Sequence, residues 1–563
     1  MNCKSIILLI VVLLFWGNAE ARKKKGKKVE EVQTESAYRK FFKGKACETA
    51  KGMITLHKMD GRVYFEIPLA LMGREMLMGS TISEITNNGF GSVGEKPKGL
   101  LYISFVRCDS VISLKQLTAQ YDTNEENLKQ RIKESTIPAT IKNFKITTYN
   151  EDSTAVVIDM TDYLVSADEA INPFSPWAPI LAGGERVMEK EFRRENSQVV
   201  SIKAFEDNVS VKSSLTYGLS LKNKVMYIFQ REPFTAVMTR SFILLPEHPM
   251  RPRLADPRIA IFSQGVSVFN GDSRGAQARY YAQRWNLEPK DMEQYRKGVL
   301  TEPKKPIVFY VDNTFPENWK KYIKEGVEVW QMAFEKIGFK NAIVARDFPV
   351  DDVTFDPDNL KYSCVRYSPS WVANAMGPSW TDPRTGEIIN ASVYLYHNLV
   401  KMVQNWRFIQ TGPADANVRK IVFDEETLGE CIRYVVSHEI GHCLGFMHNM
   451  AASSAIPVDS LRSPSFTQKY GTTYSIMDYA RNNYVAQPGD KEKGVKLTPP
   501  DLGLYDLFTV AWSYTPLPEA KTSEEEVPVL DRWITEKSGD PIYRYGKQQM
   551  YMRLDPSSFE EDL

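Results

Sequence analysis

The sequence predicts a multi-domain protein in which β-rich N-terminal domains precede a mixed α+β domain. The chain has 563 residues, which suggests roughly three or four domains. Strand-like runs joined by turn residues dominate up to about residue 250, and short apolar strands then alternate with helical patterns. We expect a small β domain at 37–95, a β-rich accessory or pro-region domain at 96–250, an extended connecting segment at 251–304, the α+β domain at 305–515 and a C-terminal extension at 516–563.

The N-terminus has the pattern of an export signal at 1–21. Lys4 precedes an apolar run at 6–16, and an Ala-Glu-Ala cleavage pattern follows at 19–21. The run is shorter than the roughly 20 residues that a transmembrane helix needs, and no comparable run follows. We therefore expect an exported mature chain without a transmembrane segment, in the periplasm, at the cell surface or in the medium. Residues 22–36 are expected to form a solvated basic tail.

Composition argues against two classes of protein. The 71 basic and 70 acidic side chains leave a net charge of +1, whereas nucleic-acid-binding proteins normally show a basic excess. We therefore expect no nucleic-acid partner. Of the six cysteines, Cys3 falls in the expected signal, and the odd remainder has no regular spacing. This pattern does not indicate a disulfide framework, so stability has to come mainly from the hydrophobic core.

Three pairs of strand-like runs predict β-hairpins in the N-terminal half. The first pair, MITLHKMDGRVYFEI, turns at an Asp-Gly pair at 60–61, which is a strong hairpin signal. The other two pairs turn near 150–153 and near 222–224. Within 251–304, a segment rich in Pro, Arg and Asp, we expect extended chain with one short helix at about 276–285.

The α+β domain is expected to open with a β-α-β unit. Strands are predicted at 307–311 and 342–345, and the helix between them has a capping-box pattern at Thr314 and Glu317. Gly338 can end this helix. Its buried face is predicted to comprise Trp319, Ile323, Val327, Trp330, Phe334 and Ile337.

The remainder of this domain is expected to add two strands and two helices. The strands lie within LKYSCVRYS and ASVYLYHN, and a turn at Asp382 to Gly386 falls between them. Capping-box patterns begin at Thr427, for a helix that reaches about Leu444, and at Thr498, for a helix through DLGLYDLFTVAW.

The stretch SHEIGHCLGFMHN carries the strongest functional signal. His438 and His442 are four residues apart, so they share one helical face and can bind the same zinc ion, with Zn–N bonds of about 2.0–2.1 Å. Glu439 can act as general base toward a water molecule on that ion. A continuous helix would carry His448 about 15 Å from His438 along its axis, so the chain has to turn between them. Gly445 is the residue best suited to end the helix, which lets His448 complete a site for one catalytic Zn²⁺ ion.

The complete pattern HExxHxxGxxH, followed by SIMDY, resembles the metzincin clan of zinc peptidases over roughly residues 305 to 515. The resemblance implies a catalytic domain with a mixed twisted sheet, an active-site helix and a Met-turn. It also implies that Met477 forms an apolar floor beneath the metal and that Tyr479 contacts the metal or the transition-state oxyanion. The alternative for Tyr479 is a tyrosine packed in the core.

Asn449 follows the third histidine, where better-known metzincin subfamilies carry Asp, Glu, Ser or Pro. The chain is more similar to a bacterial family of exported multi-domain zinc metallopeptidases, through HNM, SIMDYARNNY and DPRTGEI. This similarity covers most of the chain, including GRVYFEIP and KKPIVFYVD. The chains of that family often extend further at the C-terminus, so a truncation of this chain at its C-terminus stays open as an alternative.

These resemblances imply an exported zinc-dependent metalloendopeptidase that hydrolyses peptide bonds with a zinc-activated water and Glu439 as general base. Its expected partners are protein or peptide substrates. Residues 373–380 resemble the strand with which the clan holds substrate, so Ala375, Met376 and Gly377 are expected to bind an extended peptide. An ordinary edge strand is the alternative. A zinc amidase acting on a non-peptide bond and a non-catalytic binding or scaffold protein remain open as other functions.

Overall fold

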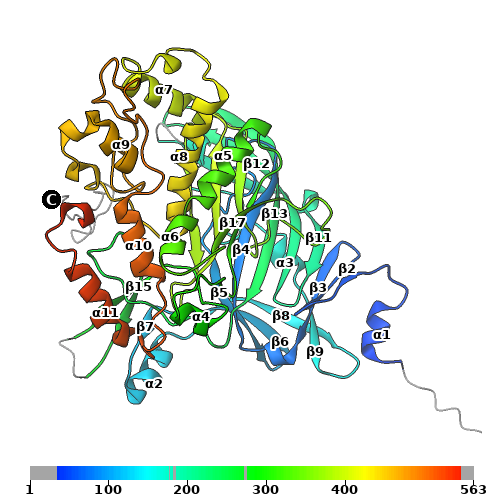
Figure 1. The fold of residues 1–563 in the computed structure, drawn as a ribbon. Helices are drawn as coiled ribbons and strands as arrows, with labels where there is room; N and C mark the ends of the chain where they lie inside the picture. The colour runs from blue at the N-terminus through cyan, green and yellow to red at the C-terminus, as the bar shows by residue number, and fades with distance from the viewer. Residues whose placement is uncertain (1–34, 177, 182–184, 272–274, 547–563) are drawn as a thin grey trace, which may run out of the picture.

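A computed structural model describes residues 35–176, 178–181, 185–271 and 275–546 (Figure 1). The expected export signal and residues 22–34 of the expected basic tail lie outside the described residues. A β-rich N-terminal region, blue to green, lies beside a C-terminal region, green to red, that carries the long helices. The predicted fold class, a β-rich region followed by an α+β region, is confirmed.

Twelve strands of the N-terminal region form one antiparallel sheet. Their order is β1-β2-β3-β9-β8-β6-β5-β4-β13-β12-β10, and β11 also pairs with β12. The strands are β1 Glu48–Ala50, β2 Thr55–Met59, β3 Arg62–Pro68, β4 Glu75–Ile85, β5 Leu101–Cys108, β6 Val111–Gln116, β8 Ala139–Tyr149, β9 Ala155–Asp159, β10 Val187–Phe192, β11 Gln198–Ala204, β12 Asn208–Lys222 and β13 Tyr227–Leu244. Strands on both sides of residue 95 therefore share one sheet, and the expected domain boundaries stay predictions.

The three predicted hairpins are confirmed. β2 and β3 are joined by Asp60 and Gly61, whose φ angles of 53° and 72° are those of the tight turn that an Asp-Gly pair favours. The hairpins β8–β9 and β12–β13 turn where the sequence predicts. Local turn chemistry was sufficient to place all three.

The prediction of a helix at 276–285 is wrong, and the bounds of the expected connecting segment stay a prediction. β14, Ser263–Val268, pairs antiparallel with β15, Gln277–Ala282, and β7, Tyr121–Asp122, adds to β14 in parallel. The short helix of this segment, α4, lies later, at Met292–Arg296. Pairing with a strand 14 positions earlier in the chain overrides the local preference of 276–285, because strand formation depends on cross-strand neighbours.

The C-terminal region is built on the predicted mixed sheet. The strands are β16 Ile307–Val311, β17 Ile343–Asp347, β18 Ser363–Ser368, β19 Ala375–Met376, β20 Ser379–Thr381 and β21 Ile388–Tyr396. Their order is β17-β16-β18-β21-β19, with β20 also paired to β21. The first four strands of that order are parallel, whereas β19 and β20 run antiparallel to β21. β19 therefore lies at an edge of the sheet.

Helices pack on this sheet and around it. In addition to α4, the described residues form α1 Ala37–Phe42, α2 Glu126–Ser135, α3 Thr161–Leu164, α5 Glu317–Glu328, α6 Gln331–Lys336, α7 Leu399–Thr411, α8 Glu425–Cys443, α9 Pro464–Tyr470, α10 Leu504–Tyr514 and α11 Ser523–Thr535. The helical face predicted from Trp319 to Ile337 belongs to α5 and α6, which divide at 329–330. All of its residues except Ile337 are buried in the core against α8 and the sheet.

The predicted caps of α5 and α8 are wrong, although both helices exist. Asp424, three residues before the expected cap, accepts a hydrogen bond from the backbone N–H of Thr427 at 2.9 Å. An aspartate acceptor just ahead of the helix is the better cap in this context. The hydroxyl of Thr314 instead bonds to Asp312 at 2.8 Å, and α5 has no side-chain cap.

The helix expected from Thr498 begins later, at Leu504. The backbone N–H of Gly503 donates to the carboxylate of Asp506 at 2.7 Å, which fixes the first turn of α10. Two prolines, at 499 and 500, precede this turn and keep the chain out of the helix.

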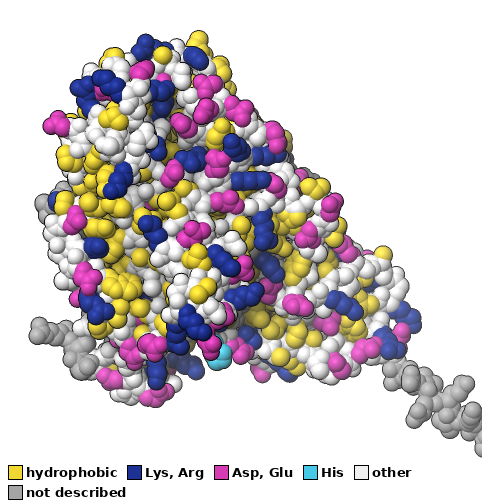
Figure 2. Space-filling view, in the orientation of Figure 1, with side chains coloured by type: hydrophobic (Ala, Val, Ile, Leu, Met, Phe, Trp, Pro, Cys, Tyr) yellow, Lys and Arg dark blue, Asp and Glu magenta, His cyan; other side chains and the backbone are white. Residues whose placement is uncertain are grey.

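The surface is mixed in charge. Lysine and arginine side chains are interspersed with acidic ones over the face shown in Figure 2. In the part of the chain that the structure describes, no helix is both long and apolar enough to cross a membrane. The five cysteines in that part are free.

Candidate active site

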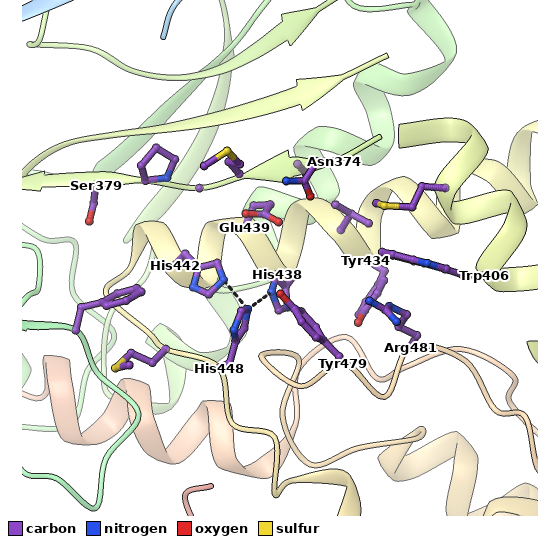
Figure 3. A pocket seen from close by; sticks show the side chains of 18 of the residues that line it. Asn374, Ser379, Trp406, Tyr434, His438, Glu439, His442, His448, Tyr479 and Arg481 are labelled. Carbon is purple, nitrogen blue, oxygen red and sulfur yellow. Dashed lines mark hydrogen bonds between the residues drawn. The ribbon is translucent and has the colours of Figure 1, made fainter. Parts of the chain in front are cut away.

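Three histidine side chains converge beside α8 (Figure 3). His438 and His442 project from one face of the helix, which ends at Cys443. Gly445 follows with φ of 95°, and a Cβ there would lie 2.1 Å from the carbonyl oxygen of Gln283. This glycine lets the chain turn back, so that Nε2 of His448 lies 3.2 Å from Nε2 of His438 and 3.1 Å from Nε2 of His442. The predicted turn at Gly445 places the three rings as expected.

Two of these rings are oriented by backbone carbonyl groups. Nδ1 of His438 lies 2.7 Å from the carbonyl oxygen of Ile476, and Nδ1 of His442 lies 2.8 Å from that of Phe446. A carbonyl oxygen only accepts, so each Nδ1 carries the hydrogen and each Nε2 keeps a lone pair for a metal. Burial lowers the pKa of His438 well below its usual value and that of His442 to about 4, so both rings are neutral.

The donor set fits zinc. The ligand atoms of His438, His442 and His448 all lie within 4.8 Å of one another. Three neutral imidazoles are a common protein ligand set for catalytic zinc and leave one coordination position free. The triad is therefore compatible with one zinc ion.

Met477 packs against α8, and its expected role as an apolar floor beneath the metal stays a prediction. It is 2% exposed, and a Cβ on Gly441 would lie 2.2 Å from its sulfur atom. The turn that carries it is fixed by Asp506, which accepts hydrogen bonds from the hydroxyl of Ser475 at 2.6 Å and from the N–H of Ile476 at 2.8 Å. Burial raises the pKa of Asp506 to about 6. Asp506 thus supports the carbonyl group that orients the first histidine, a role that the sequence pattern did not reveal.

Glu439 follows the first histidine and borders the same cavity. Burial raises the pKa of its carboxyl group to about 8, and a hydrogen bond from the backbone N–H of Gly377 acts in the opposite direction. A nearby cation favours the ionised carboxylate and would lower this pKa. A carboxyl group with a pKa near neutrality can both accept and return a proton, as a general base has to.

The predicted substrate strand lies against α8. Ala375 and Met376 pair with Leu395 and Tyr394 of β21, and within the described residues no strand pairs with the other edge of β19. Gly377 packs so closely that a Cβ would lie 2.2 Å from the carbonyl oxygen of Glu439. All three predicted residues line the cavity, and their role in binding substrate stays a prediction.

Tyr479 lies at the cavity rather than in the core. Its ring centroid is 4.5 Å from that of His448 and 5.6 Å from that of His438, and the residue is 44% exposed. Partial burial and then the charge of Glu439 raise the pKa of its hydroxyl. This position matches the predicted one, and the role of the hydroxyl stays a prediction.

The cavity has a volume of about 820 Å³ and includes residues that the sequence did not indicate. Tyr434 and Val435 could have been found, because they lie one helical turn before His438. Four others lie far from the motif in sequence and come from the β14–β15 segment and from α7: they are Phe262, Gln283, Met402 and Trp406. The cavity is also lined by Met447 inside the motif, by Arg481 two residues after Tyr479, and by Asn374 within the predicted substrate strand.

Comparisons with known proteins agree with this arrangement. Residues 420–563 match a family model described as Met-zincin. Residues 96–290 and 35–85 match two models described as domains of unknown function, DUF5117 and DUF5118. No curated protein and no solved structure matches the chain. The match at 420–563 includes α8, the three histidines and Met477.

Proposed function

We propose that this chain, in which a Met-zincin domain follows DUF5118 and DUF5117 domains, is an exported zinc-dependent metalloendopeptidase. One observation carries the proposal. The three Nε2 atoms of the histidine triad converge in one cavity. Glu439 and the unpaired edge of β19 in the described residues line the same cavity. A metal site, a general base and a strand edge for an extended chain are the elements that peptide hydrolysis needs.

His438, His442 and His448 would hold one zinc ion. When bound, zinc would polarise the scissile carbonyl group and lower the pKa of a water molecule in the site. The bonds of His438 and His442 to backbone carbonyl groups keep their Nε2 atoms aimed at the ion. The carboxylate of Glu439 takes the proton of the attacking water and returns it to the leaving amine.

Substrate binding is assigned to the free edge of β19. A peptide that adds to this edge as a further strand passes Glu439, because Gly377 packs directly on the helix at that residue. The cavity wall continues from Asn374 to Ser379, on both sides of the histidine triad (Figure 3). Residues on both sides of the scissile bond can therefore be held, which favours cleavage inside a chain.

A supporting role is assigned to the β-rich N-terminal region. Nζ of Lys96 donates to the hydroxyl of Ser392 on β21 at 3.0 Å, and the hydroxyl of Tyr394 donates to the carbonyl oxygen of Gly94 at 3.2 Å. Among the described residues, none before Phe262 lines the cavity. The region thus supports the strand that carries β19 while the cavity stays accessible. Export is supported by the signal pattern at 1–21.

Peptide hydrolysis tests the proposal. The full-length protein, loaded with zinc, is incubated with a diverse peptide mixture with and without chelator, and products are identified by mass spectrometry. Glu439→Gln should cleave about 100- to 10,000-fold more slowly, and Glu426→Gln, an exposed control on the first turn of α8, should match the parent.

Two results would overturn the proposal: cleavage by Glu439→Gln at the parent rate, or a triad that binds no zinc. Zinc-loaded protein that cleaves no peptide would instead favour an amidase of non-peptide bonds or a binding protein.

A further inference from the structure

Among the described residues that line the active-site cavity, Arg481 carries the one Lys or Arg side chain. Its guanidinium carbon lies 3.9 Å from the centroid of the Trp406 ring and 5.1 Å from that of Tyr479. Figure 3 shows it at one end of the site, next to Tyr434 and on the side of His438. An arginine in this place can reach a peptide bound beside the triad.

The backbone around Arg481 is held in place. Arg481 has a φ of 52°, which is rare for a residue with a side chain. The next residue, Asn482, donates from its backbone N–H and its side-chain amide to Gln410 of α7, at 3.3 Å and 2.9 Å. These bonds fix the segment to the helix that carries Trp406. The guanidinium is thus oriented by its backbone and by stacking on an aromatic ring.

No carboxylate within the described residues lies within 4.0 Å of the Arg481 guanidinium. The neighbouring Arg407, which also lies on α7, differs, because it pairs with Asp415 at 3.4 Å. A guanidinium at an apolar wall without a counterion favours binding of an anion there. Its planar donors suit a carboxylate in particular.

The direction of β19 shows which part of a substrate reaches Arg481. A peptide that pairs antiparallel with this strand begins at the Ser379 end and leaves at the Asn374 end. Figure 3 shows Ser379 on the side of His442 and Asn374 on the side of Trp406 and Arg481. For a peptide in this antiparallel orientation, Arg481 lies along the part that follows the scissile bond.

We propose that Arg481 binds a carboxylate of the substrate on the C-terminal side of the scissile bond and thereby selects the peptides that are cleaved. The inference rests on the proposed function, because it assumes that a peptide occupies the cavity. The carboxylate comes from an Asp or Glu side chain or from the free end of the peptide. Trp406 holds the guanidinium in position.

Binding to a catalytically inactive protein tests this inference without hydrolysis. The zinc-loaded Glu439→Gln protein is titrated calorimetrically with acetylated, alanine-rich octapeptides that carry Glu, Gln or Lys at one scanned position and end in an amide. The Gln peptides are also made with a free C-terminal carboxylate. The same titrations are repeated with the double variant Glu439→Gln/Arg481→Gln. The matched control is Glu439→Gln/Arg346→Gln, whose second substitution lies on β17 at the far edge of the sheet.

A carboxylate peptide should bind about tenfold more tightly than its Gln amide, the factor expected of one charge-assisted hydrogen bond. Arg481→Gln should remove this preference, and Arg346→Gln should keep it. A preference for Glu amides identifies an acidic side chain as the source, and a preference for the free acid alone identifies the chain end.

Equal or undetectable binding of all the peptides, or a preference that survives in Arg481→Gln, overturns the inference. Because the titrations need no turnover, a parent protein that cleaves nothing would refute the proposed function and leave this result standing. Equal zinc content and circular dichroism of the variants confirm that they are folded.

Discussion

His438 donates a hydrogen bond from Nδ1 to the backbone carbonyl group of Ile476, with 2.7 Å between the two atoms. The two residues lie 38 positions apart, so the first histidine of the triad is oriented by the turn that follows the third. Asp506 holds that turn from α10. The metal site therefore depends on a connection among α8, the turn at Met477 and α10.

Replacing Asp506 by Ala should weaken zinc binding. The turn would lose two hydrogen bonds, and the carbonyl group of Ile476 would lose its fixed position. We therefore expect zinc affinity to fall about 10- to 100-fold, as it does when other residues that orient metal ligands are replaced. Competition with a chelating dye near neutral pH measures the affinity. Asp531→Ala, on the exposed side of α11, is the matched control. Unchanged affinity in Asp506→Ala would show that the turn is held without this carboxylate.

The same carboxyl group should make stability depend on pH. Burial raises the pKa of Asp506 from 3.8 to about 6, so the folded protein binds this proton more tightly than the unfolded chain does. The stabilisation is complete below about pH 4 and is lost as pH rises to about 6, a change of about 3 kcal/mol.

Asp506→Asn, which mimics the protonated group, should therefore gain stability relative to the parent over this interval. Urea unfolding of the metal-free proteins measures the difference in the free energy of unfolding. A difference that stays constant across the interval would contradict the buried position of the carboxyl group.

Gly377→Ala should reduce catalysis while zinc is retained. The new Cβ would lie 2.2 Å from the carbonyl oxygen of Glu439, so the strand has to move away from the helix. We expect kcat/KM to fall about 100-fold, as a displacement of roughly 1 Å can cause. Gly99→Ala is the control, because a Cβ there meets no atom within 4 Å. Equal activity of the two variants would mean that β19 does not position the substrate.

Tyr479→Phe should lower kcat more than it changes KM. Removing a hydroxyl group that donates to the oxyanion is expected to cost about 100-fold in kcat. Tyr484→Phe serves as the control, because Tyr484 is 70% exposed. If kcat of Tyr479→Phe equals that of the control, the ring serves only to pack against His448.

Much of the metal site could be predicted because its information is local. Helical spacing places His438 and His442 on one face, and a glycine at 445 permits the return of His448. Turn chemistry likewise places the hairpin at Asp60 and Gly61. These features depend on residues that are close in sequence, so a single sequence carries them.

The rest of the cavity wall, apart from the predicted strand at 375–377, could not be predicted because its information is long-range. Phe262 and Gln283 flank strands β14 and β15, which exist only through their pairing with each other and with β7. Asp506 and Arg481 carry no local pattern that marks a role, since their importance comes from contacts with the turn at Ile476 and with Trp406. The cap at Thr427 is wrong for a local reason, because Asp424, three residues earlier, supplies the acceptor.

The most direct test of zinc-dependent peptide hydrolysis is to titrate the metal-free protein with zinc and to measure the rate of peptide hydrolysis at each step. The rate should rise in proportion to added zinc and level off at one ion per chain, and His442→Ala should show no rise. Hydrolysis at the full rate without zinc, or one zinc ion bound at the triad with no hydrolysis of any peptide, would contradict the account.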